Sequence, residues 1–196
     1  MVVLDSLEDP KTAELLLSGC VGVLPTDTVY GLVCRAGDET AVARLYALKK
    51  REAKPGTLIA ADIGQLADLG IKARYLKPVT HYWPNPISII IPTAGLEYIH
   101  QGVGSLAVRI PADQPLQTLL ARTGPLLTSS ANQPGEPEPA NIAGAKGYFG
   151  DSIDFYVDGG DMSGRKPSTL IRIVDDAVEV LRQGAVLVNE NGEIQS

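Results

Sequence analysis

The segment Pro125-Leu126-Leu127-Thr128-Ser129-Ser130-Ala131-Asn132 begins as a short apolar run and ends in small polar residues. An apolar run of this length, bounded by proline, is typical of a buried strand. Open α/β sheets form ligand crevices where their strands end, and small side chains let a ligand approach the backbone closely. Ser and Asn are equally common in a hydrogen-bonded turn after a strand. The segment alone leaves both interpretations open, a ligand site and a structural turn.

Helical and strand patterns alternate on both sides of this segment. The expected helices, several of which begin at an Asp or Asn cap, cover residues 9–19, 38–49, 62–69, 115–122 and 141–149. The expected strands cover residues 21–24, 57–60, 87–91, 106–110, 126–129, 153–157, 169–174 and 178–181. Strands outnumber helices, and several strands follow one another directly. The sequence therefore predicts a single α/β domain with α+β character over residues 1–196, in which helices pack on a twisted mixed β-sheet.

Composition limits the class of protein. A chain of 196 residues with 44% hydrophobic residues can bury a sizeable core. Its apolar runs are too short to cross a bilayer, and its first residues lack the pattern of a signal peptide, so we expect a cytoplasmic protein with no membrane partner. The formal net charge of −6 argues against a broad nucleic-acid-binding surface, although it allows a local basic cavity.

Cysteine and histidine are scarce. Cys20 and Cys34 are expected to be two buried thiols. His81 and His100 have no cysteine or carboxylate at ligand spacing, so we expect no metal site built from protein side chains. No Ser-His-Asp or Cys-His set is evident, and we expect no covalent nucleophile.

Lys49-Lys50-Arg51 follows the end of an expected helix, shortly before Lys54-Pro55-Gly56. Cations at a helix C-terminus favour the negative end of the helix dipole, and many such runs are simply exposed to solvent. A rigid turn next to a buried strand can instead direct long side chains at one place. Arg109 lies within an apolar strand pattern, where a guanidinium needs a partner. The candidates are a ligand carboxylate and an internal acid, Asp27 or Asp158.

Several segments, taken together and in this order, resemble the YrdC family of threonylcarbamoyl-AMP synthases in its short, single-domain form. These segments are Pro25-Thr26-Asp27-Thr28-Val29-Tyr30-Gly31-Leu32, Lys49-Lys50-Arg51, Ser105-Leu106-Ala107-Val108-Arg109-Ile110-Pro111, Ser130-Ala131-Asn132, Asp158-Gly159-Gly160, Pro167-Ser168-Thr169 and Leu181-Arg182-Gln183-Gly184. The resemblance extends from about residue 9 to residue 184. It implies the YrdC-like fold, with a central cleft.

The resemblance also implies an activity, that of a nucleotidyltransferase. The enzyme would form threonylcarbamoyl-AMP and pyrophosphate from L-threonine, bicarbonate and ATP, for threonylcarbamoyl-adenosine modification of tRNA by downstream transfer proteins. Mg²⁺ would arrive with ATP. The implied ATP-binding residues are Lys49, Arg51, Lys54, Ser105, Ser130, Asn132 and Arg182, of which Lys49 and Arg51 would stabilise charge during catalysis. The implied L-threonine-binding residues are Thr28, Tyr30, Arg109, Thr128 and Ser168.

The chain departs from the family pattern in two places. Glu138-Pro139-Ala140 stands where many members have Ser-Pro-Thr, and Asn85 replaces a common glycine between two prolines. The turn-rich segment 133–139 is either a lid over the site or an ordinary surface connection. The alternative function is a non-catalytic double-stranded RNA-binding or ribosome-maturation protein, and weak RNA binding is also compatible with the synthase. Hydrogenase-maturation proteins carry a related domain, but with additional segments for which this chain has no room.

Overall fold

The computed structural model describes residues 1–50, 54–175 and 177–195. The strands are β1 (Val2–Leu4), β2 (Gly22–Pro25), β3 (Tyr30–Arg35), β4 (Thr57–Ile59), β5 (Ile87–Pro92), β6 (Ser105–Arg109), β7 (Leu126–Ser130), β8 (Phe155–Val157), β9 (Thr169–Val174), β10 (Ala177–Arg182), β11 (Leu187–Val188) and β12 (Ile194–Gln195). The α-helices are α1 (Pro10–Leu17), α2 (Glu39–Lys49), α3 (Ile63–Asp68), α4 (Ala73–Leu76), α5 (Glu97–His100), α6 (Gln114–Thr123) and α7 (Ile142–Phe149). Two 3₁₀ helices are η1 (Lys77–Tyr82) and η2 (Gly150–Ser152).

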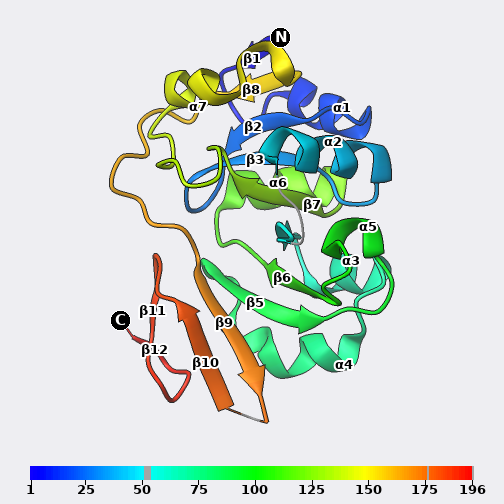
Figure 1. Ribbon diagram of the computed structural model, residues 1–196, viewed down its shortest axis with the longest axis vertical. Coiled ribbons are helices and arrows are strands. Elements are labelled where there is room, and N and C mark those ends of the chain that lie inside the picture. Colours follow the sequence, from blue (N-terminus) through cyan, green and yellow to red (C-terminus); the bar gives the residue numbers. More distant parts are fainter. Residues whose placement is uncertain (51–53, 176, 196) are drawn as a thin grey trace.

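Within the described residues, one large sheet contains every strand from β1 to β10. Its strands lie in the order β1-β8-β2-β3-β7-β4-β6-β5-β9-β10. The sheet is mixed, since β4 pairs parallel with β6 and antiparallel with β7. It extends along the long axis of the molecule, from β1 near the N-terminus at the top of Figure 1 to β10 at the bottom. The predicted mixed α/β sheet is confirmed.

Helices cover both faces of this sheet because its central strands are apolar on both sides. In β3, Leu32 and Cys34 belong to one buried cluster and Val33 belongs to the other, as the twofold alternation of a strand requires. The first cluster includes residues of α2 and α7, and the second includes residues of α1 and α6. The sheet is therefore the middle layer of three.

The predicted starts of four helices, α1, α2, α3 and α7, are confirmed by their caps, whereas α6 begins one residue before its predicted range. Asp9 accepts a hydrogen bond from the Lys11 N–H and precedes Pro10, the first residue of α1. Asp38 accepts from the Ala41 N–H at the start of α2. The caps of α3, α6 and α7 are Asp62, Asp113 and Asn141.

The main omission of the sequence prediction is β3, which lies in the centre of the sheet between β2 and β7. Its first three residues belong to the segment from Pro25 to Leu32, which is interpreted from sequence as a turn, and its buried residues show no polar alternation. The expected burial of both thiols is correct for Cys34 and wrong for Cys20, which is half-buried. Burial raises the pKa of the Cys34 thiol, with a smaller contribution from Asp38. Among the helices that the structure describes, none is long and apolar enough to cross a membrane.

Candidate functional site

A cavity of about 240 Å³ opens on the face of the sheet that α1 and α6 cover only in part. Ile59 and Leu126 pair across β4 and β7 and pack in the cluster that contains α6 residues. Thr57 and Thr128 lie two residues away from this pair in their strands, on the same face of the sheet. They pair with each other and line the cavity. The uncovered, polar part of the sheet face is thus the floor of the cavity.

Thr128 is held between two glycines. A Cβ added to Gly31 would lie 2.5 Å from the Thr128 Oγ1, and one added to Gly56 would lie 2.7 Å from the Thr128 carbonyl oxygen. Both glycines line the cavity. Only a residue without a side chain permits this approach, so the glycines set the position of the Thr128 hydroxyl.

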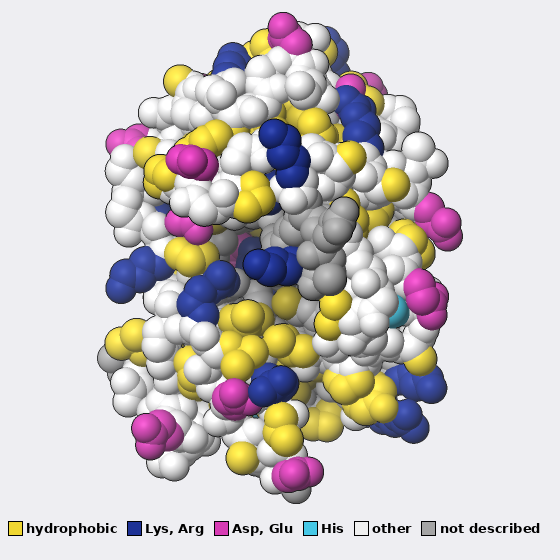
Figure 2. Space-filling view, viewed as in Figure 1, with side chains coloured by type: hydrophobic (Ala, Val, Ile, Leu, Met, Phe, Trp, Pro, Cys, Tyr) yellow, Lys and Arg dark blue, Asp and Glu magenta, His cyan; other side chains and the backbone are white. Residues whose placement is uncertain are grey.

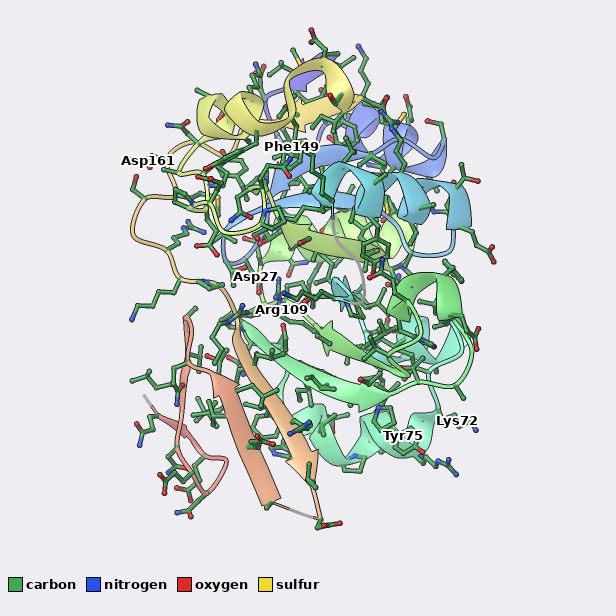
Figure 3. All side chains as sticks on the ribbon, viewed as in Figure 1. Asp27, Lys72, Tyr75, Arg109, Phe149 and Asp161 are labelled. Atoms are coloured by element: carbon green, nitrogen blue, oxygen red, sulfur yellow. The ribbon has the colours of Figure 1, made fainter. Side chains whose placement is uncertain are left out.

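Arg109, at the end of β6, lines the cavity and is buried, with 4% of its side chain exposed. Its Nη2 donates to the Asp27 Oδ1 at 2.9 Å, and its Nη1 donates to the Ser88 Oγ at 3.2 Å. Figure 3 shows Asp27 and Arg109 close together in the middle of the molecule. Of the two internal acids predicted as candidates, the structure selects Asp27.

Hydrogen bonds continue from Arg109 to Arg182. The hydroxyls of Ser88 and Ser168 lie 2.8 Å apart. Arg182 donates to the Ser168 carbonyl oxygen through Nη2 at 2.8 Å and through Nε at 3.2 Å. Ser168 and Arg182 both line the cavity. Two predicted threonine-binding residues, Arg109 and Ser168, are thus connected through Ser88 to each other and, from Ser168, to the predicted ATP-binding residue Arg182.

Lys49 occupies a different environment. The end of α2 places it in the protein interior, 3% exposed, whereas the helix-end position had suggested an exposed cation. Its Nζ donates to the Ser130 carbonyl oxygen at 2.7 Å and to the Asn132 carbonyl oxygen and Oδ1 at 2.5 and 3.1 Å. The Ser130 hydroxyl also donates to the Asn132 Oδ1. Lys49 therefore fixes the turn that follows β7.

The loop that follows this turn brings Glu138 to the cavity wall. Partial burial lowers the pKa of Arg182, while the charge of Glu138 opposes that shift and the charge of Arg109 adds to it. Glu138 is exposed and lines the cavity, so a carboxylate belongs to the solvent-accessible part of this wall. Figure 2 shows Lys and Arg side chains around a hollow in the middle of the molecule, at the height where Figure 3 places Asp27 and Arg109.

Three further predicted residues that the structure describes, Tyr30, Lys54 and Ser105, are not part of the cavity wall. Tyr30 is fully buried, and its hydroxyl donates to the Gly160 carbonyl oxygen and accepts from the Gly159 N–H. It faces away because its neighbour Gly31 lines the cavity, and adjacent strand residues point to opposite faces. Lys54 is exposed, and Ser105 pairs with Pro92 at the start of β6. Arg51 lies outside the described residues.

The structure thus gathers six predicted residues in one cavity. They are Thr28, Arg109, Thr128 and Ser168 from the threonine-binding set and Ser130 and Arg182 from the ATP-binding set. Whether they bind these ligands stays a prediction. Sequence reasoning missed Ser88, although a lone serine in the apolar run of β5 was a detectable signal of a buried polar contact.

Two proteins of similar sequence carry the same name. A threonylcarbamoyl-AMP synthase from Chromohalobacter salexigens is 36% identical, and the match covers 85% of this chain and 91% of that protein. A threonylcarbamoyl-AMP synthase from Stutzerimonas stutzeri is 33% identical, with 83% and 90% covered. These names agree with the predicted enzyme and give no support to the RNA-binding alternative.

Solved structures share the fold. P. abyssi Sua5 complexed with L-threonine is 26% identical, with a TM-score of 0.82 over 95% of this chain, which spans 58% of that longer protein. E. coli YciO is 22% identical, with a TM-score of 0.76 over 93% of both chains, and this likeness concerns the fold alone. The family model of Sua5, YciO and YrdC proteins, described as telomere recombination, matches residues 14–184. The chain therefore belongs to the Sua5/YciO/YrdC family.

Proposed function

We propose that this protein is a threonylcarbamoyl-AMP synthase. It converts L-threonine, bicarbonate and ATP into threonylcarbamoyl-AMP and pyrophosphate, and downstream transfer proteins use the adenylate to modify tRNA. The relatives named threonylcarbamoyl-AMP synthase support this activity, and the L-threonine complex of Sua5 supports the amino acid.

The observation that carries the proposal is the composition of the cavity. A guanidinium, that of Arg109, lies among the hydroxyl-bearing side chains of Thr28, Thr128 and Ser168. A guanidinium suits a carboxylate, and the hydroxyls can donate to and accept from a second polar group. L-threonine presents a carboxylate, an amine and a hydroxyl within the size of a small cavity. These are the groups that this wall can recognise.

The chemistry needs alignment and charge neutralisation. The threonine amine and bicarbonate form a carbamate with loss of water. A carbamate oxygen then attacks the α-phosphorus of ATP, a P–O bond forms, and pyrophosphate leaves with the bonding electron pair. Positioned cations stabilise the charge that develops on phosphate oxygens, so the reaction requires no covalent enzyme intermediate.

Among the cations that the structure describes, Arg182 is well placed for the phosphates, since it lines the cavity beside Ser168. Lys49 would act indirectly, by holding the Ser130–Asn132 turn against the nucleotide. Mg²⁺ would be held by the ATP phosphates and would add neutralising charge there. The nucleotide would extend beyond the 240 Å³ cavity through its open side.

The test is the dependence of pyrophosphate release on each substrate. Purified protein with Mg²⁺ and ATP should release pyrophosphate and form threonylcarbamoyl-AMP, detected by mass spectrometry, only when both L-threonine and bicarbonate are present. Release that continues unchanged without either compound would identify a nucleotide hydrolase and reject the proposal.

A further inference from the structure

Asp27 and Ser88 hold the Arg109 guanidinium from behind. They bind Nη2 and Nη1, so both ends of the guanidinium fork are fixed. Arg109 itself lines the cavity, whereas Asp27 and Ser88 are not among the described residues of its wall. Arg109 and Ser88 are buried residues, and only 6% of the Asp27 side chain is exposed. A group held this way meets a ligand without reorganising.

The ion pair is not fully satisfied. The Asp27 Oδ2 and the Arg109 Nε are buried, and neither has a hydrogen-bond partner within the described part of the chain. A buried polar atom without a partner is costly, and more so when its group is charged. The pair therefore has one buried acceptor and one buried donor without a partner among the described residues, and of the two side chains only Arg109 lines the cavity.

The net charge of the pair is zero, and this restricts what can bind. A ligand with only a carboxylate would place a second negative charge near Asp27, in a site where burial strengthens repulsion. A ligand that also carries an ammonium restores the balance. An amino acid in its zwitterionic form thus suits the pair better than the same molecule without the amine.

We propose that Asp27 is a positioning residue that holds Arg109 and sets the charge of this subsite, so that the site selects an amino acid over a simple hydroxy acid. This inference rests on the proposed function, because it assumes that Arg109 faces the carboxylate of L-threonine. The proposed selection acts when L-threonine enters the site with its amine protonated. Ser88 contributes position without charge.

The decisive variant is Asp27→Asn, which keeps the shape and removes the charge. The probe is (R)-3-hydroxybutyrate, which is L-threonine without its amine, used as a competitive inhibitor. In the variant the KM for L-threonine should rise about tenfold while the KM for ATP stays within about twofold. The ratio of the inhibition constant of 3-hydroxybutyrate to the KM of threonine should fall by at least roughly tenfold, because the subsite has become net positive.

Two further variants separate charge from position. Ser88→Ala should raise the KM for threonine and leave the inhibition ratio unchanged, since it removes a hydrogen bond and no charge. Glu179→Gln is the matched control, because it removes the carboxylate of the exposed Arg172–Glu179 pair on β9 and β10 and should change neither quantity. If Asp27→Asn does not fold, Asp27→Ser removes the same charge and carries the same expectation.

The outcomes are distinguishable. An Asp27 variant with lower thermal stability but an unchanged inhibition ratio and threonine KM has lost only a structural ion pair, and the inference is then wrong. Wild-type protein that releases pyrophosphate without threonine contradicts the proposed function itself. Threonine-dependent wild-type protein whose Asp27 variant keeps the wild-type ratio contradicts only the role of Asp27.

Discussion

Arg109 and Lys49 are both buried cations near the cavity, and their surroundings differ. Arg109 pairs with a carboxylate, and its Nε–H has no partner among the residues that the structure describes, whereas the Lys49 ammonium donates to three oxygens of the chain itself. On the proposed amino-acid side of the site, the cation is thus prepared for a ligand. On the proposed nucleotide side, Lys49 fixes the backbone, and the ligand would meet what that backbone presents.

The largest expected effect comes from Arg109→Lys. Lysine keeps the charge beside Asp27 but cannot reproduce the fork, so the KM for L-threonine should rise roughly ten- to a hundredfold, which corresponds to about 1.5–3 kcal/mol. The KM for ATP should change much less. Steady-state kinetics with each substrate varied in turn measures both. A loss of thermal stability with an unaltered threonine KM would show that Arg109 is structural and would remove one side of the comparison.

Lys49→Met tests the other side. The side chain keeps its apolar stem, but the oxygens of Ser130 and Asn132 lose a charged donor, so the free energy of unfolding should fall by about 1–3 kcal/mol. Urea denaturation measures it. The matched control is Lys50→Met, because Lys50 is the exposed neighbour and its replacement should stay within about 0.5 kcal/mol. Equal effects of the two substitutions would mean that Lys49 does not hold the turn.

Gly31→Ala asks how closely the amino-acid side is fitted. The new Cβ would lie 2.5 Å from the Thr128 Oγ1, so that hydroxyl must move. The KM for threonine should rise about three- to tenfold, since a shifted group weakens a fitted contact. Gly37→Ala is the control, because nothing lies within 4 Å of its added Cβ. If both variants bind threonine as the wild type does, the Thr128 hydroxyl is not part of the subsite.

The smallest effect is expected far from the cavity, at the Arg44–Asp154 pair. Burial would raise the pKa of Asp154, but hydrogen bonds from Arg44 and the Val21 N–H outweigh it and lower the pKa overall. A lowered pKa gives stability that is present above the unfolded-state value of about 3.9 and is lost as the pH falls through the folded-state value. Asp154→Asn should therefore cost less than about 1 kcal/mol at pH 7, since both side chains are partly exposed.

Thermal unfolding of wild type and Asp154→Asn between pH 7 and pH 2 measures this effect. The difference between the two proteins should shrink as the solution becomes acidic. A difference that stays constant over this range would show that ionisation of Asp154 contributes nothing.

Sequence patterns identified several residues of the cavity wall but did not predict their contacts or their orientation. Arg109 was detectable because a guanidinium in an apolar strand needs a partner, but Asp27 lies in a distant turn that no periodicity connects to β6. Tyr30 was predicted to bind threonine, but the side of the sheet to which it points depends on the residue alternation of β3, a strand that the sequence did not predict. The burial of Lys49 depends on how the Ser130–Asn132 turn packs against α2. Helix ends follow from local chemistry, whereas these three facts depend on contacts between remote segments.

The cavity wall joins residues from the two ends of the chain, with Thr26 and Thr28 before β3 and Ser168 and Arg182 around β9 and β10. β9 reaches this position by pairing parallel with β5, a contact between remote segments that forms slowly in folding. No partly folded chain that lacks β9 and β10 can present the complete wall. Because a ligand stabilises only the state that binds it, threonine would raise the unfolding temperature of the finished protein and leave such intermediates without benefit. The amino acid would then act on the folding equilibrium as a selective stabiliser of the completed chain.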